Sequence, residues 1–124
     1  MAGGPIKAYG KVASLVMCEF WPDTANDPST YRLDDEVTSV VHTATGQWTV
    51  QLRNQHRKVS VVGLVLGLAT PGMNGLTAQV DNEGSATAPS VLVSYCSSGT
   101  TLADIAADDD NRIALLLYIE DGEY

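Results

Sequence analysis

The feature that most constrains this chain is the alternation of apolar and polar residues over short segments bounded by turn residues. Residues 47–53 alternate strictly, with apolar side chains at every second position. Because successive side chains of a strand point to opposite faces, this pattern predicts a half-buried strand. Residues 37–41 are rich in valine and precede a short turn in which Gly46 can adopt a positive φ. Residues 36–53 are therefore predicted to form a β-hairpin.

The rest of the chain repeats this strand pattern. Five further segments are apolar at alternate positions or throughout, namely residues 11–20, 59–69, 76–80, 91–95 and 112–120. Glycine, proline and aspartate separate them, and no long helix is indicated. The sequence therefore predicts an all-β fold, a small β-sandwich or jelly-roll-like barrel of about seven antiparallel strands.

Two longer connections are predicted to contain no strand. Residues 21–35 contain two prolines and several aspartates, which is typical of irregular loops. Residues 99–111 are predicted to hold one helical turn through Leu102, Ile105 and Ala106. Neither segment is expected to add to the sheets.

The length of 124 residues suffices for one ordinary hydrophobic core, so a single domain is expected. Residues 1–10 lack a core pattern and are predicted to be a flexible N-terminal arm, which leaves residues 11–124 as one β domain. The N-terminus has no apolar run of the kind that a secretory signal requires. The longest apolar run, residues 59–69, is about half the length of a bilayer crossing. The chain is expected to be made in the cytoplasm, with no membrane span.

The charge balance disfavours nucleic acid as a partner. The chain carries 15 acidic and 7 basic residues, a formal net charge of -8, and such a surface repels phosphate backbones. The few basic residues gather once, at Arg53, His56, Arg57 and Lys58. This cationic group is a candidate contact with an acidic protein surface.

No catalytic motif stands out. The sequence contains no phosphate-binding loop and no GxSxG, HExxH or CxxC motif. His42 and Cys18 could supply a base and a nucleophile, but no spacing motif marks them, and a packed or solvated histidine explains His42 equally well. The chain is predicted not to be an enzyme and to need no cofactor.

An acidic loop near the C-terminus offers oxygen ligands that a hard cation would favour, at Asp104, Asp108, Asp109 and Asp110. The loop lacks the alternate spacing and the distal glutamate of a calcium-binding loop. A solvated acidic loop that discourages edge-to-edge pairing of strands is therefore predicted, without a metal. A cation site is the alternative if this loop lies beside residues 34–36.

The two cysteines, Cys18 and Cys96, both fall in predicted strands. In a reducing compartment such residues usually behave as small buried hydrophobic groups. The alternative is that they face one another across two sheets and oxidise after release from the cell.

Three predicted strands, residues 11–20, 59–69 and 112–120, are apolar on both faces. In a lone two-sheet sandwich, one face of each strand would be exposed to water. Covering an extra strand face of roughly 200 to 300 Å² is worth several kcal/mol at about 25 cal/mol/Å², so self-association is predicted. The alternative is that these are central strands of a barrel, which show the same pattern.

The two faces of residues 59–69 differ in bulk. The bulky face is predicted to enter the core and comprises Ser60, Val62, Leu64, Leu66 and Leu68. The other face is small and flat, so that a neighbour could approach it closely; it comprises Val59, Val61, Gly63, Val65, Gly67 and Ala69.

Aromatic residues are candidates for contacts with other molecules. Trp48 shares its face with two other apolar residues and is predicted to lie in the core. Trp21 precedes Pro22, which holds it extended in a loop where it could contact another chain; packing under its own loop is the alternative. Only Trp21 and Tyr31 are credible for a sugar-binding face. The candidate interface residues are Ile6, Tyr9, Trp21, Tyr31, Arg53, Arg57 and Lys58.

Two segments resemble small structural proteins of tailed-bacteriophage virions, which decorate or cement the capsid or belong to fibres and spikes. The segment SVVHTATGQWTVQL is similar to a hairpin that recurs in those proteins. The segment LADIAADDDNRIALLLYIED is similar to their ending, in which an aspartate-bearing loop precedes a last apolar strand. Together the two segments cover about 35 residues.

The resemblance implies a structural protein of the virion, made in the host cytoplasm and located on the capsid surface. It would be a β-sandwich or jelly-roll-like homotrimer without catalytic residues, bound to the major capsid protein where capsomers meet. Its function would be to stabilise the head as a decoration or cement protein. The alternative is a receptor- or carbohydrate-binding module of a head or tail fibre.

Overall fold

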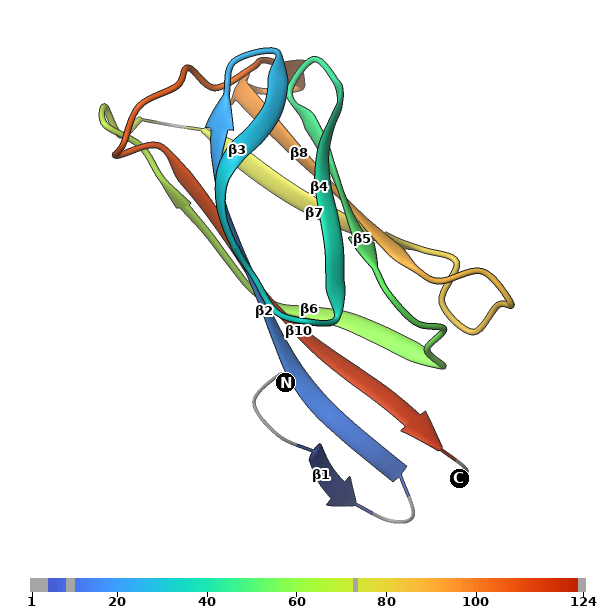
Figure 1. Cartoon of the computed structure of the whole chain (residues 1–124). Coiled ribbons are helices and arrows are strands. Elements are labelled where there is room, and N and C mark those ends of the chain that lie inside the picture. Colours follow the sequence, from blue (N-terminus) through green and yellow to red (C-terminus); the bar gives the residue numbers. More distant parts are fainter. Residues whose placement is uncertain (1–4, 9–10, 73, 123–124) are drawn as a thin grey trace.

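The computed structural model describes residues 5–8, 11–72 and 74–122, and it confirms the predicted all-β class and the small β-sandwich. Two five-stranded antiparallel sheets pack against each other (Figure 1), which is more strands than the seven or so predicted. The first sheet contains β1 (Pro5–Ala8), β2 (Lys11–Asp23), β3 (Asn26–Leu33), β6 (Lys58–Gly67) and β10 (Arg112–Gly122). The second contains β4 (Val37–Ala44), β5 (Gln47–Leu52), β7 (Gly75–Asp81), β8 (Ser90–Ser98) and β9 (Thr101–Leu102).

The long strands β2 and β10 form the centre of the first sheet. β10 pairs with β2 on one side and with β6 on the other. On its other edge β2 pairs first with β1 and then with β3. In the second sheet the order is β4-β5-β8-β7, and β9 pairs with β8. The described part of the chain contains no helix of the length and hydrophobicity that a bilayer crossing demands.

The core consists of the inward faces of both sheets. In β10 the odd positions 113 to 119 are buried, and in β2 the buried side chains include Val16, Cys18 and Phe20. The second sheet contributes Trp48, whose ring centroid lies 5.9 Å from that of Phe20. This pairing of large side chains across the sheets confirms the predicted core position of Trp48.

The prediction of an irregular segment over residues 21–35 is wrong. β2 continues to Asp23, and β3 returns along its edge with Tyr31 opposite Phe20. Thr24 makes the reversal at a φ of 52°. Proline is tolerated here because β3 is an edge strand and Pro28 lies within the irregular part of its pairing, so that its missing N–H costs no ladder bond.

The helical turn predicted within residues 99–111 is also wrong. β9 occupies the start of this segment, Ile105 is buried, and Leu102 is exposed, so the two side chains do not share one face. The backbone bonds to β8 and to the β2–β3 turn instead: Ala103 N–H donates to Tyr95 O, and Thr24 N–H donates to Ile105 O. These long-range bonds replace the local bonds of a helix.

Part of the predicted N-terminal arm is a strand. Residues 5–8 form β1, which pairs with residues 11–14 of β2. Residues 1–4 and 9–10, including the interface candidate Tyr9, lie outside the described residues.

A β-bulge in β6 changes which side chains face the core. Val61 is paired with Leu117 and Gly63 with Leu116, so Val62 is an extra residue that has no pairing partner in β10. The core face therefore runs through Val59 and Val61, shifts phase at the bulge, and continues through the leucines 64, 66 and 68. The predicted core position is therefore wrong for Ser60 and for Val62, which is 57% exposed. The predicted place of Val59 and Val61 on the small outer face is also wrong, because both side chains pack in or against the core.

The bulge predicts that the same substitution has unequal effects on stability at two adjacent valines. We expect Val61→Asp to lower the free energy of unfolding by about 2 kcal/mol or more, because the charge would face the core. We expect Val62→Asp to change it by less than about 0.5 kcal/mol, as for an ordinary surface substitution. Urea unfolding of both variants measures the difference, and a larger loss in Val62→Asp would contradict the register.

Candidate functional site

The outer face of the first sheet is apolar. The register places Met17 beside Leu116, and Leu15 beside Tyr118, all on the side opposite the core. Together with two valines of β6 they form what we call the outer patch: Leu15, Met17, Val62, Val65, Leu116 and Tyr118. Met17 is 60% exposed and Val65 49% exposed. The structure therefore leaves this part of the second face of the central strands partly exposed, whereas Ala13 and Glu120, further along the same face, are buried.

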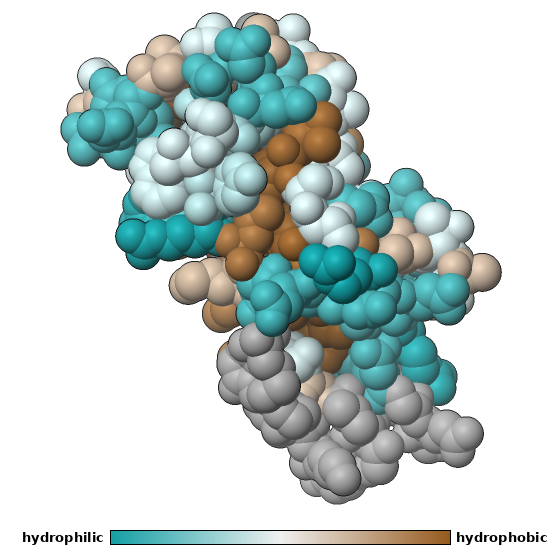
Figure 2. Space-filling view, viewed as in Figure 1, coloured by the Kyte–Doolittle hydropathy of each residue, from teal (hydrophilic) through white to brown (hydrophobic). Residues whose placement is uncertain are grey.

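Hydrophobic surface also appears elsewhere on the molecule. Figure 2 shows a hydrophobic band that runs obliquely across one face between polar regions. At the edge formed by β6 and β7, a groove of about 370 Å³ is lined mainly by apolar residues, among them Val61, Leu64 and Leu76. Val62 also lines this groove, so the outer patch continues around the β6 edge.

A polar cluster bounds the outer patch at one end. Glu19 lies next along β2, and its carboxylate accepts a 2.6 Å hydrogen bond from Arg112 Nη1. Arg32 Nε lies 3.9 Å from the other carboxylate oxygen. The Glu19 side chain is only 15% exposed, and the two arginines compensate its negative charge. These three residues separate the outer patch from the region around Trp21.

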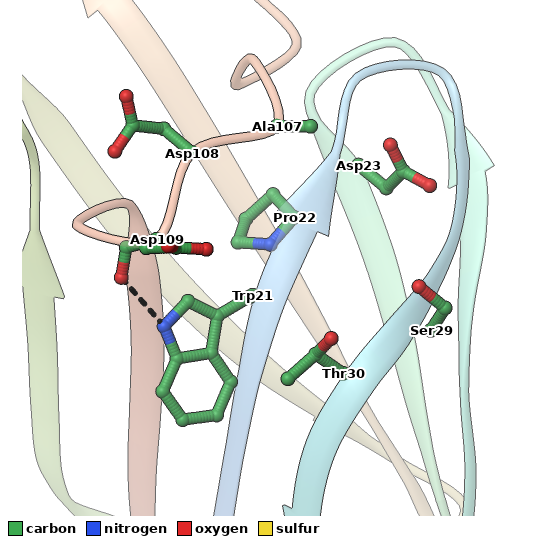
Figure 3. A pocket seen from close by; sticks show the side chains of 8 residues that line it. All are labelled: Trp21, Pro22, Asp23, Ser29, Thr30, Ala107, Asp108 and Asp109. Carbon is green, nitrogen blue, oxygen red and sulfur yellow. Dashed lines mark hydrogen bonds between the residues drawn. The ribbon is translucent and has the colours of Figure 1, made fainter.

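A pocket of about 390 Å³ lies beyond this cluster, at the end of the sheet that carries the β2–β3 turn (Figure 3). Trp21 Nε1–H donates a 3.0 Å hydrogen bond to the backbone oxygen of Asp109, which holds the indole under the 107–109 loop. Trp21 therefore does not lie in a loop and does not pack under its own loop: it is part of β2, and the loop over its indole comes from 88 positions away in the chain. The pocket is lined by Trp21, Pro22, Asp23, Ser29, Thr30, Ala107, Asp108 and Asp109.

Trp21 and Tyr31 do not share a face. Tyr31 pairs with inward-facing Phe20, whereas Trp21 pairs with Thr30. Neighbouring pairs of a ladder point to opposite sides of the sheet. Tyr31 is 53% exposed at the sheet edge but does not line the Trp21 pocket. A sugar-binding face built from both rings is therefore not formed.

The cationic group lies among carboxylates at the opposite end of the sandwich. Arg53 Nε donates to Asp35 O at 2.8 Å, and the backbone N–H of Arg57 donates to Asp121. His56 Nδ1 lies 2.7 Å from Asp121 Oδ2, and its Nε2 contacts the carboxylate of Glu36. These contacts tie the β5–β6 loop to the β3–β4 turn and to β10. Lys58 is exposed at the start of β6, and Ile6 lies in β1.

Asp104 and His42 fasten the long loop after β9 to the β4–β5 hairpin. Asp104 Oδ1 lies 2.7 Å from His42 Nε2 and accepts a 2.7 Å hydrogen bond from Gly46 N–H. Gly46 has a φ of 68°, and a Cβ there would lie 2.7 Å from backbone atoms of Ala103. Burial raises the pKa of Asp104, but the Gly46 N–H and the His42 imidazole outweigh it and leave the pKa below its usual range.

The acidic loop is organised by bonds within the protein. Asp108 Oδ1 accepts from Asp110 N–H, and the buried Asn111 bonds to the backbones of Ala69 and Ala106. The described residues contain no group of three or more side chains arranged to hold a metal ion. Residues 34–36 form the β3–β4 turn, at the other end of β3 from this loop. The acidic loop therefore does not lie beside residues 34–36, the arrangement that would have favoured a cation site.

The cysteines are both free. Cys18 points into the core, where burial, together with the charge of Glu19, raises the pKa of its thiol to about 12. Cys96 follows inward-facing Tyr95 in β8 and so points outward. A disulfide between them across the sheets is therefore geometrically excluded. His42 is bonded to Asp104 rather than to Cys18, so the structure does not form the base and nucleophile pair considered for them.

No protein-family model matches the chain, and neither a curated protein nor a solved structure is significantly similar to it.

The Asp104 contacts predict a pH dependence of stability. A carboxyl group whose pKa is lower in the folded state stabilises the fold above its unfolded pKa, and this contribution is lost as pH falls through the folded pKa. We expect Asp104→Asn to be less stable than the natural chain by about 1 to 2 kcal/mol near pH 7. This difference should shrink below the ordinary value of 3.8.

Urea unfolding between pH 2 and pH 7 measures this difference. Thr43→Val in the same hairpin removes no titratable group, so its effect should not vary with pH. A constant difference between Asp104→Asn and the natural chain over the whole range would contradict the assignment.

Proposed function

We propose that this protein is a structural subunit of a larger assembly and, more specifically, a decoration or cement protein of a tailed-bacteriophage capsid. The observation that carries the proposal is the outer patch, an apolar region on the central strands that the folded chain leaves partly exposed. The resemblance of the 36–53 hairpin and of the C-terminal segment to small virion proteins supports the specific assignment.

Burial of the outer patch would favour association. Covering roughly 200 to 300 Å² of apolar surface contributes about 5 to 8 kcal/mol at 25 cal/mol/Å². The loss of translational and rotational freedom on association costs about 4 to 15 kcal/mol. A single contact of this size is therefore weak, whereas several contacts repeated by symmetry bind strongly. That balance suits a subunit that acts within a symmetric shell, as a homotrimer seated where capsomers meet.

A charged residue in the outer patch should abolish self-association. The natural chain should have a solution mass above the 13.1 kDa of one copy, and Val65→Glu should return it to that mass. Val41→Glu is the matched control, because Val41 is an exposed valine on the other sheet, at 40%. Light scattering after size exclusion measures the mass, and a natural chain that is monomeric would contradict self-association.

Binding to capsids tests the specific assignment. Expanded empty shells built from the major capsid protein of the virus that encodes this chain should bind it and melt at a higher temperature. Val65→Glu should lose both effects, and Val41→Glu should retain both. A natural chain that binds no shell would overturn the assignment to the capsid, even if it self-associates.

A further inference from the structure

The Trp21 pocket contains a rigid aromatic wall. The indole is fixed by its hydrogen bond to Asp109 O and flanked by Pro22, which is fully buried. Figure 3 shows the indole beneath the loop that carries Asp109, with Thr30 beside it on β3. An aromatic ring that is held in place in this way offers a flat apolar face at a low entropic cost to a ligand.

Polar side chains of the pocket are left without partners. Among the described residues, no hydrogen bond is formed by the carboxylates of Asp23 and Asp109 or by the hydroxyls of Ser29 and Thr30. Of the three carboxylates that line the pocket, only that of Asp108 forms a hydrogen bond among the described residues, which it accepts from Asp110 N–H. A carboxylate only accepts, whereas a hydroxyl both donates and accepts. The wall around the indole therefore offers both kinds of hydrogen-bonding group.

This combination fits a neutral saccharide better than a cation. A sugar ring has an apolar face for the indole and hydroxyl groups that can donate to Asp23 and Asp109 while exchanging bonds with Ser29 and Thr30. A basic side chain could donate to the carboxylates and to the hydroxyl oxygens, but it has no acceptor for the two hydroxyl protons. It would also approach Arg32, whose partner Glu19 precedes Trp21 on the same face of β2. An acidic sugar would be repelled by the carboxylates.

We propose that the Trp21 pocket binds one or two rings of a neutral glycan. Its volume of about 390 Å³ lies within the usual range of small-ligand sites. The site is separate from the outer patch, because the Glu19 cluster lies between them. The same subunit can therefore assemble through one part of the sheet and bind sugar through another.

A glycan array probed with the full labelled chain tests the proposal. We expect binding to neutral glycans and at least tenfold weaker binding to sialylated forms of the same glycans. Calorimetric titration with the best neutral glycan should show at least tenfold weaker binding for Trp21→Ala. Asp23→Asn and Thr30→Val should each weaken binding severalfold and, because both positions are on the pocket wall, leave the melting temperature nearly unchanged.

Two variants separate ligand contact from loop anchoring. Trp21→Phe keeps an aromatic face but loses the N–H donor to Asp109, so it should retain more affinity than Trp21→Ala. Tyr31→Ala is the matched control on the opposite face and should bind like the natural chain. The proposal is overturned if no glycan binds, if only acidic glycans bind, if polylysine binds the pocket instead, or if Asp23→Asn and Thr30→Val have no effect. None of these results bears on the outer patch, which Val65→Glu tests by itself.

Discussion

The structure depends on the ladder in which β10 pairs with β2 on one side and β6 on the other. This pairing holds the odd positions of β10, from Ile113 to Ile119, in the core. Since side chains alternate, the same ladder points Leu116 and Tyr118 outward. The core and the outer patch are thus the two faces of the same strands. Because β10 is apolar at both odd and even positions, the sandwich can bury only one of its two apolar faces.

Electrostatics decide how this uncovered face can be used. The chain carries a formal net charge of -8, so copies repel one another at long range, and salt screens that repulsion. On the outer face the carboxylate of Glu19 is compensated by Arg112 and Arg32. Contact between copies through the outer patch therefore brings little uncompensated charge together. The Glu19 cluster also divides the sheet into an apolar region and the pocket around Trp21.

Side-chain bonds order the loop that forms one wall of this pocket. The segment after β9 has little regular structure, yet Asp104 ties it to the β4–β5 hairpin, Asn111 ties it to residue 69, and Trp21 bonds to Asp109. The acidic residues here serve different purposes. Asp104 and Asp108 satisfy backbone donors, whereas the carboxylates of Asp23 and Asp109 have no partner among the described residues.

The sequence alone determined the fold class and the hairpin, because period-two alternation is a local property of strands. It also indicated that 112–120 would be apolar on both faces. Only the tertiary structure decided the rest. β3 exists because β2 offers a free edge, which outweighs the loop preference of proline and aspartate at residues 21–35. The bulge at Val62 reversed the phase of β6 halfway along, which no alternation pattern records. Trp21 met Asp109 across 88 positions, because strand register, a long-range property, determines which distant side chains meet.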